Sequence, residues 1–254
     1  MQVDLNCDMG EGFGQYCAGA DDELMPWITS ANIACGYHAG DPLVMRRTVS
    51  LAARYSVGVG AHPGFPDLMG FGRRRIQVTA EEVENYVLYQ VGALAAFARA
   101  ENVQLAHIKA HGALYNMAET DANVAEAILR AIERFDRSLV VVCPAGSTMA
   151  QMASDRGLRV AREGFADRAY NPDGTLRSRR LPGALIEDPH AAAEQAVRMV
   201  RDRAVVTSTG EEIPFQVDTV CLHGDAPGAL GAARAVRAAL VAAGIRVEPM
   251  GNFL

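Results

Sequence analysis

Histidines and carboxylates that follow short apolar runs are the residues of this chain best suited to acid–base or metal chemistry. The segment from Val3 to Gly14 carries Asn6, Asp8 and Glu11 among three glycines. Carboxylates can bind a metal ion or carry a proton, and glycine lets the backbone turn sharply and approach a ligand closely. The segment therefore predicts the opening part of an active site at the end of a β-strand.

Polar residues follow most of the later apolar runs in the same way, and five of the six histidines fall in or beside these runs. A single histidine there is usually structural. Repetition favours a shared site, because the carboxyl ends of parallel strands converge on one face of a barrel. We expect catalytic roles for Asp8, His38, His62, Lys109, His111, His223 and Asp225. We expect substrate contacts from Asn6, Glu11, Arg73, Arg74, Glu163, Asp167 and Arg168.

A divalent metal is one interpretation of this set. Asp8, His38 and His62 could form a site of two histidines and one carboxylate, a donor set that suits zinc, manganese or iron. The alternative is a metal-free site in which a histidine acts as general acid or base. The spacing is not a compact local motif, so the sequence leaves both alternatives open.

Lys109 shares one face of its predicted strand with His107 and His111, because side chains alternate between the two faces. Neighbouring imidazoles could lower the pKa of the Lys109 ammonium, or the ammonium could bind an anionic group. The structural alternative is an ion pair with a carboxylate such as Glu163 or Asp167.

Arginines cluster in two places. Arg73 and Arg74 follow a glycine-rich loop, and Arg177, Arg179 and Arg180 lie in a polar segment. Planar guanidinium groups bind carboxylate or phosphate well, although a solvated surface run would look the same.

Strand and helix patterns alternate along the chain, which predicts a parallel sheet, and seven or eight such units favour a closed barrel in a single domain over residues 1–254. Helix starts are indicated by capping residues at Asp41, Thr79, Asp121 and Asp188. Ala204–Gln216 breaks the rhythm and predicts a hairpin inserted before the last main strand. The predicted strands are Val3–Cys7, Ile28–Cys35, Val57–Ala61, Leu105–Ala110, Leu139–Cys143, Leu158–Ala161, Val217–Leu222 and Ile245–Val247.

Composition excludes several classes of protein. The net charge of −6 argues against a nucleic-acid footprint, and no stretch approaches the roughly 18 apolar residues of a membrane span. Five cysteines without a Cys-x-x-Cys pair or a secretion signal indicate reduced, buried thiols and a cytoplasmic protein. Neither a phosphate loop nor a Gly-x-Ser-x-Gly nucleophile motif occurs.

The motifs taken together resemble the LamB/YcsF family over essentially the whole chain. One departure is Ala110, where the family typically has proline between the lysine and the histidine. The segments that carry the resemblance are 4–14 (DLNCDMGEGFG), 32–42 (NIACGYHAGDP), 60–67 (GAHPGFPD), 70–74 (GFGRR), 111–116 (HGALYN), 163–168 (EGFADR) and 221–225 (CLHGD).

The resemblance implies a seven-stranded, TIM-like barrel related to the glycoside hydrolase/deacetylase group. It also implies the activity of the A subunit of an ATP-dependent 5-oxoprolinase, which cleaves the lactam of 5-oxo-L-proline to L-glutamate. ATP is then a co-substrate, and a divalent metal could enter with ATP or in the site itself. Two further 5-oxoprolinase subunits, B and C, are the expected partners.

For such a reaction we expect His38 or His62 to act as general base on water, assisted by Asp8. Lys109 or an arginine would neutralise the substrate carboxylate or the transferred phosphate. His223 and Asp225 would protonate the leaving nitrogen. Two other classes stay open: a metal-dependent deacetylase or amidohydrolase, and a non-catalytic lactam-binding subunit.

Overall fold

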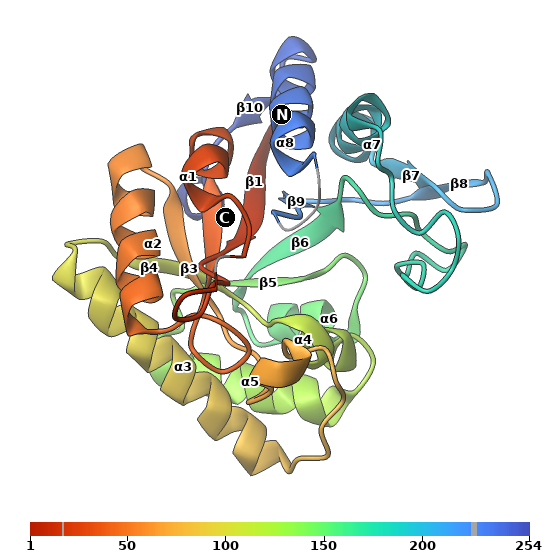
Figure 1. Cartoon of the computed structure of the whole chain (residues 1–254). Coiled ribbons are helices and arrows are strands. Elements are labelled where there is room, and N and C mark those ends of the chain that lie inside the picture. The colour runs from red at the N-terminus through yellow and green to blue at the C-terminus, as the bar shows by residue number, and fades with distance from the viewer. Residues whose placement is uncertain (17, 225–227) are drawn as a thin grey trace.

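Short runs rich in valine, isoleucine and alanine form the strands of a closed parallel barrel, as the computed structural model shows for residues 1–16, 18–224 and 228–254 (Figure 1). Each strand pairs in parallel with the next, and the last of the seven pairs with both β6 and β1, which closes the barrel. The seven strands are β1 (Gln2–Met9), β2 (Ser30–Ala34), β3 (Gly58–His62), β4 (Leu105–Lys109), β5 (Val140–Pro144), β6 (Arg159–Phe165) and β9 (Thr219–Leu222).

An eighth strand, β10 (Arg246–Val247), extends the sheet by pairing with the first residues of β1. All eight predicted strands are therefore confirmed in position, and so is the barrel. The insertion is confirmed as well, because β7 (Ala204–Val206) and β8 (Glu212–Pro214) form an antiparallel hairpin outside the barrel.

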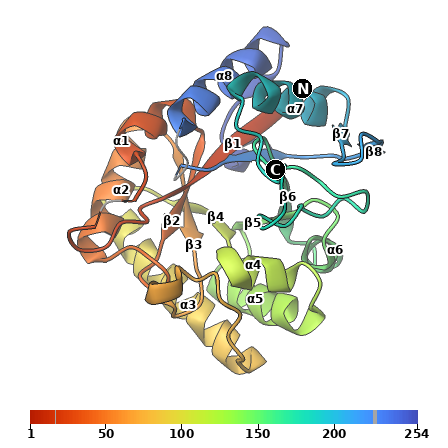
Figure 2. The same ribbon diagram turned by 45° about the vertical axis from the view of Figure 1, so that its right-hand side comes forward.

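Helices surround the barrel (Figure 2). The predicted caps at Asp41, Thr79, Asp121 and Asp188 each accept hydrogen bonds from backbone N–H groups of the first turn, and Thr79 forms a full capping box with Glu82. The helices are α1 (Asp21–Leu24), α2 (Pro42–Tyr55), α3 (Ala80–Ala100), α4 (Gly112–Ala118), α5 (Ala122–Phe135), α6 (Thr148–Asp155), α7 (Pro189–Arg201) and α8 (Ala229–Ala242). The described residues also form three short 3₁₀ turns: η1 (Met25–Trp27), η2 (Leu68–Gly70) and η3 (Met250–Asn252).

The main hydrophobic core includes Leu5, Ile33 and Ile128, whereas much of the barrel interior is polar. Alternate residues of β1, namely Asp4, Asn6 and Asp8, make side-chain hydrogen bonds to residues of other strands. This is the expected result of the two-residue period of a strand. A small apolar cluster of Val140, Val142, Ala161 and Met250 is separate from the main core.

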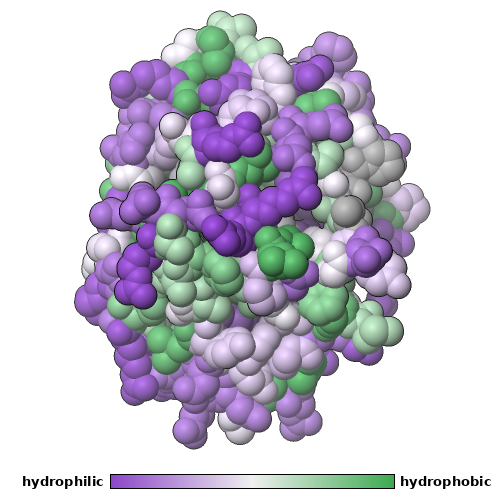
Figure 3. Space-filling view, turned by 60° about the vertical axis from the view of Figure 1, so that its left-hand side comes forward, coloured by the Kyte–Doolittle hydropathy of each residue, from purple (hydrophilic) through white to green (hydrophobic). Residues whose placement is uncertain are grey.

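The four described cysteines, Cys7, Cys35, Cys143 and Cys221, are buried and free, as predicted, whereas Cys17 lies outside the described residues. Across the described ranges, no helix combines the length and apolarity needed to cross a bilayer. The face in Figure 3 mixes hydrophilic residues with scattered hydrophobic ones.

Candidate active site

A cavity of about 490 Å³ opens at the carboxyl ends of the barrel strands. Its volume falls within the range of about 300–1,000 Å³ that is typical of ligand pockets. Side chains reach it from the ends of β1, β3, β4 and β9 and from the loop after β6. Of the predicted site residues, it is lined by Asp8, Glu11, His62, Arg73, Lys109, His111, Arg168 and His223.

The other predicted residues lie around this lining. Asn6, His38, Glu163 and Asp167 are wholly or mostly buried and contact lining residues from behind. Arg74 pairs with Asp67 at the start of η2, away from the cavity lining. Asp225 lies outside the described residues.

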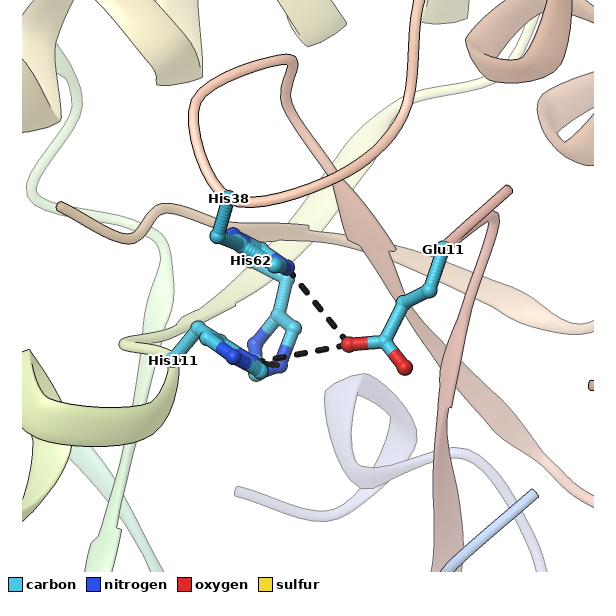
Figure 4. Close-up of side chains that lie close together, drawn as sticks. All are labelled: Glu11, His38, His62 and His111. Atoms are coloured by element: carbon cyan, nitrogen blue, oxygen red, sulfur yellow. Dashed lines mark hydrogen bonds and ion pairs between the residues drawn. The ribbon is translucent and has the colours of Figure 1, made fainter. Parts of the chain in front are cut away.

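A cluster of three histidines and one carboxylate occupies one side of the cavity (Figure 4). Glu11 Oε1 is 3.5 Å from both His38 Nε2 and His111 Nδ1, and His111 Nδ1 is 2.9 Å from His62 Nε2. One ligand atom from each of the four residues lies within 4.8 Å of the others. Nitrogen and carboxylate donors at this spacing could hold a metal ion.

Backbone carbonyls fix two of the rings. His62 Nδ1 donates to the carbonyl of Lys109 at 2.8 Å, and His111 Nε2 donates to the carbonyl of Phe71 at 2.9 Å. Burial lowers the pKa of His111 to about 3, and burial together with the neighbouring imidazoles holds the pKa of His38 well below its ordinary value. His38 and His111 are therefore neutral near pH 7.

Glycines make room for these rings. A Cβ atom at Gly64 would lie 2.7 Å from His38 Nδ1, and one at Gly72 would lie 2.7 Å from the Cβ of His38 and 2.9 Å from the ring of His111. Gly72 also has a φ of +62°, a conformation that other residues seldom adopt. Gly64 and Gly72 therefore allow close packing around the rings of His38 and His111.

Lys109 is buried between two carboxylates. Its Nζ lies 3.0 Å from Asp8 Oδ1 and 2.8 Å from Glu163 Oε1, and Tyr115 donates a hydrogen bond to the other oxygen of Glu163. Burial acts to lower the pKa of Lys109, but Asp8, Cys221 and Glu163 outweigh it and hold the pKa well above its ordinary value. The lowered pKa considered from the sequence is wrong, and the ion pair with Glu163 is confirmed.

The amide side chains of Asn6 and Asn32 hold Lys109 and Asp8 in place on the side away from the cavity. Asn32 Nδ2 donates to Asp8 Oδ1 at 2.8 Å and to Asn6 Oδ1 at 2.7 Å, and Asn6 Oδ1 accepts from Lys109 at 3.2 Å. The ring of His107 donates to Asn32 Oδ1 at 2.8 Å, which fixes the orientation of that amide. These groups orient Asp8 and Lys109 rather than line the cavity.

His223 and Asp167 form a second pair of acid–base groups at the cavity. His223 Nδ1 lies 2.7 Å from Asp167 Oδ2, and His223 Nε2 accepts a hydrogen bond of 2.7 Å from Arg179. Burial raises the pKa of Asp167, but His223 more than offsets this, so the pKa is lowered. The pair is an imidazole oriented by a carboxylate, with an arginine on its outer nitrogen.

Three site residues were absent from the predicted set. Asn32 stands in register with Asp8 on the adjacent strand, and the polar pattern of Ser30 and Asn32 within β2 was the available signal. Tyr115 lay in a motif without an assigned role. Arg179 was one of the arginines with two interpretations, and the structure places it in the cavity lining with a hydrogen bond to His223.

The whole chain matches known proteins. The family model of the LamB/YcsF family matches residues 3–254. The chain belongs to the LamB/YcsF family. Among its relatives is the A subunit of 5-oxoprolinase from Pyrococcus furiosus, which is 55% identical over 254 residues and is covered completely, as is this chain. A protein of the same name from Symbiobacterium thermophilum is 55% identical over 250 residues, or 98% of this chain and 96% of that protein.

A solved structure with nearly half of its residues identical has the same fold. The crystal structure of the lactam utilization protein from Thermus thermophilus superposes with a TM-score of 0.94 at 47% sequence identity. The match covers 98% of this chain and 99% of that protein. The expected family and barrel are thereby confirmed.

Proposed function

We propose that this LamB/YcsF protein is the A subunit of an ATP-dependent 5-oxoprolinase. In this role it opens the lactam of 5-oxo-L-proline to L-glutamate, together with partner subunits B and C. The observation that carries the proposal is full-length identity of about 55% with proteins named as the A subunit of 5-oxoprolinase. A cavity lined by arginines and by acid–base groups suits a small anionic lactam.

A lactam carbonyl resists water because amide resonance lowers its electrophilicity. Transfer of the γ-phosphoryl group of ATP to the carbonyl oxygen releases ADP and makes the ring carbon attackable. Water then adds to this carbon, and the ring C–N bond breaks as the nitrogen takes a proton, which leaves an acyl phosphate. A second water releases phosphate and glutamate.

Arginines rather than Lys109 bind the anionic groups. Lys109 already neutralises Asp8 and Glu163 in a buried position, so its charge is not available to a ligand. Arg73 and Arg179 line the cavity. They stabilise the substrate carboxylate and the phosphoryl group through charge-assisted hydrogen bonds.

Two imidazole systems serve the two proton transfers. His62 carries its Nδ1 proton on a backbone carbonyl and presents Nε2 to the cavity beside Asp8, so the histidine cluster is the part of the site that activates the attacking water. Once substrate draws Arg179 away, His223 Nε2 takes up a proton from water, and the imidazolium, oriented by Asp167, passes that proton to the leaving nitrogen. Protonation there decides the outcome, because expulsion of phosphate instead of the amine would regenerate the lactam.

ATP binding belongs to the partner subunits in this proposal. The absence of a phosphate loop from the sequence agrees with such a division.

The test is glutamate formation from 5-oxoproline and ATP by purified subunits B and C, with this chain present, omitted or replaced by His62→Ala or His223→Asn. We expect activity only with the wild-type chain and with the control His190→Gln, which removes an exposed histidine of α7. Full activity without the chain would refute the function, and full activity with both site variants would refute the assigned roles.

A further inference from the structure

Two ring nitrogens of the histidine cluster, His62 Nε2 and His111 Nδ1, face each other across the cluster. His62 uses its Nδ1 proton on the carbonyl of Lys109, and His111 uses its Nε2 proton on the carbonyl of Phe71. This leaves His62 Nε2 and His111 Nδ1 directed at each other, 2.9 Å apart, in the part of the cavity where Glu11 and Asp8 also lie. Two imidazole nitrogens that converge in this way are arranged as ligands of one metal ion are.

Carboxylates flank this pair of nitrogens. Glu11 Oε1 is 3.5 Å from His111 Nδ1, and Asp8 Oδ2 is 3.3 Å from His62 Nε2. In a tetrahedral site with bonds of about 2.0–2.1 Å, neighbouring ligand atoms lie roughly 3.3 Å apart. The observed separations of 2.9, 3.3 and 3.5 Å bracket that value.

His38 plays a different part, although it lies within the same cluster. Its ring stacks on the ring of His111, with the centroids 3.7 Å apart and an interplanar angle of 2°. A metal ion lies in the plane of each imidazole that binds it, so one ion cannot be in the planes of both stacked rings. The rings of His62 and His111, at 88° to each other, do not meet this obstacle.

We propose that the cluster is a divalent transition-metal site in which His62, His111, Glu11 and Asp8 are the ligands and His38 is a positioning residue. The backbone carbonyls behind the two histidines set the tautomers that metal binding needs, as is usual around protein metal sites. Two imidazoles and two carboxylates suit zinc, manganese, iron or cobalt better than calcium.

The four ligands all line the cavity, whereas His38 does not. An ion held there is accessible from the cavity. Metal binding by the isolated chain does not depend on the lactam reaction, so the two proposals can fail separately.

The test uses the full-length chain, stripped with a chelator and titrated with Zn²⁺ by calorimetry and with Co²⁺ by visible absorption. We expect one ion per chain and the intense d–d bands of a Co²⁺ ion with low coordination number. His62→Ala and His111→Ala should each weaken binding by at least ~100-fold. His38→Asn should weaken binding by only about 10–100-fold, the usual cost of losing a residue that orients a ligand, and so by less than either ligand variant.

The control is His190→Gln, which should bind like the wild type. Circular dichroism melts of every variant separate ligand loss from unfolding. Absence of stoichiometric binding by the wild-type chain would overturn the site, and so would binding that survives loss of both His62 and His111 in a folded variant. A His38→Asn variant as defective as His62→Ala would overturn the assigned ligand set.

Discussion

Asp4 is a buried carboxyl group whose ionisation should make the fold less stable as pH rises. Its side chain is completely buried and accepts hydrogen bonds from Thr29, Ser30 and Thr219 at 2.5–2.7 Å and from the Met250 backbone at 3.2 Å. Burial raises the pKa of Asp4 from 3.8 to about 6 despite these hydrogen bonds.

The direction of the effect follows from proton binding. Between about pH 4 and pH 6 the native state holds the Asp4 proton more tightly than the unfolded state, so the free energy of unfolding falls as pH rises through this window. The full difference of about 2 pKa units corresponds to about 3 kcal/mol, all of it lost above about pH 6.

We therefore expect Asp4→Asn to gain stability relative to wild type as pH rises, by about 2 kcal/mol between about pH 4.5 and pH 7.5. Any cost of exchanging one hydrogen bond is independent of pH. The change with pH of the stability difference between Asp4→Asn and wild type therefore reports the ionisation of Asp4. Urea unfolding of both proteins at several pH values measures it, with the exposed carboxylate variant Glu23→Gln as control. A stability difference that stays flat or decreases with pH would refute the reasoning.

Two further predictions concern the site. Lys109→Met should lower the free energy of unfolding by about 3–5 kcal/mol, because it leaves the carboxylates of Asp8 and Glu163 buried without their cation. Adding Glu163→Gln should restore part of this loss in denaturant titrations, and an additive double variant would contradict the coupling. Asp167→Asn should lower kcat of the reconstituted complex about 10²–10⁴-fold with little change in KM, since Asp167 orients His223; unchanged kcat would exclude this role.

Local signals made most of the fold predictable. Strands, caps and the inserted hairpin each depend on residues that are close in sequence, and all were found where the pattern placed them. The main error is the length of β6, which continues from the predicted end at Ala161 to Phe165. The apolar pattern stops early because Arg162 and Glu163 are charged, and Glu163 is paired with Lys109 in the barrel interior.

The topology of a parallel barrel made it possible to predict which residues belong to the site. It did not allow us to predict which side chains pair with one another. Parallel strands must bring their carboxyl ends together, which is why His62, His111 and His223 share one cavity. Which atoms meet depends on strand register and on loop geometry. Arg179 reaches His223 from a loop 44 residues away, and no local pattern encodes that contact.

Asp8 joins the two charged systems of the site through its two oxygens. Oδ1 accepts from Lys109 and Asn32, and Oδ2 faces His62 at 3.3 Å. Because Lys109 and Asn32 hold one oxygen in place, they also set the position of the other oxygen relative to His62, and Asn32 does so from outside the cavity lining. A change at Asn32 should therefore disturb chemistry at His62 without removing any group that binds substrate. The end of β1 at Asp8 is thus the point at which the structural ion pair of the barrel and the histidine cluster meet.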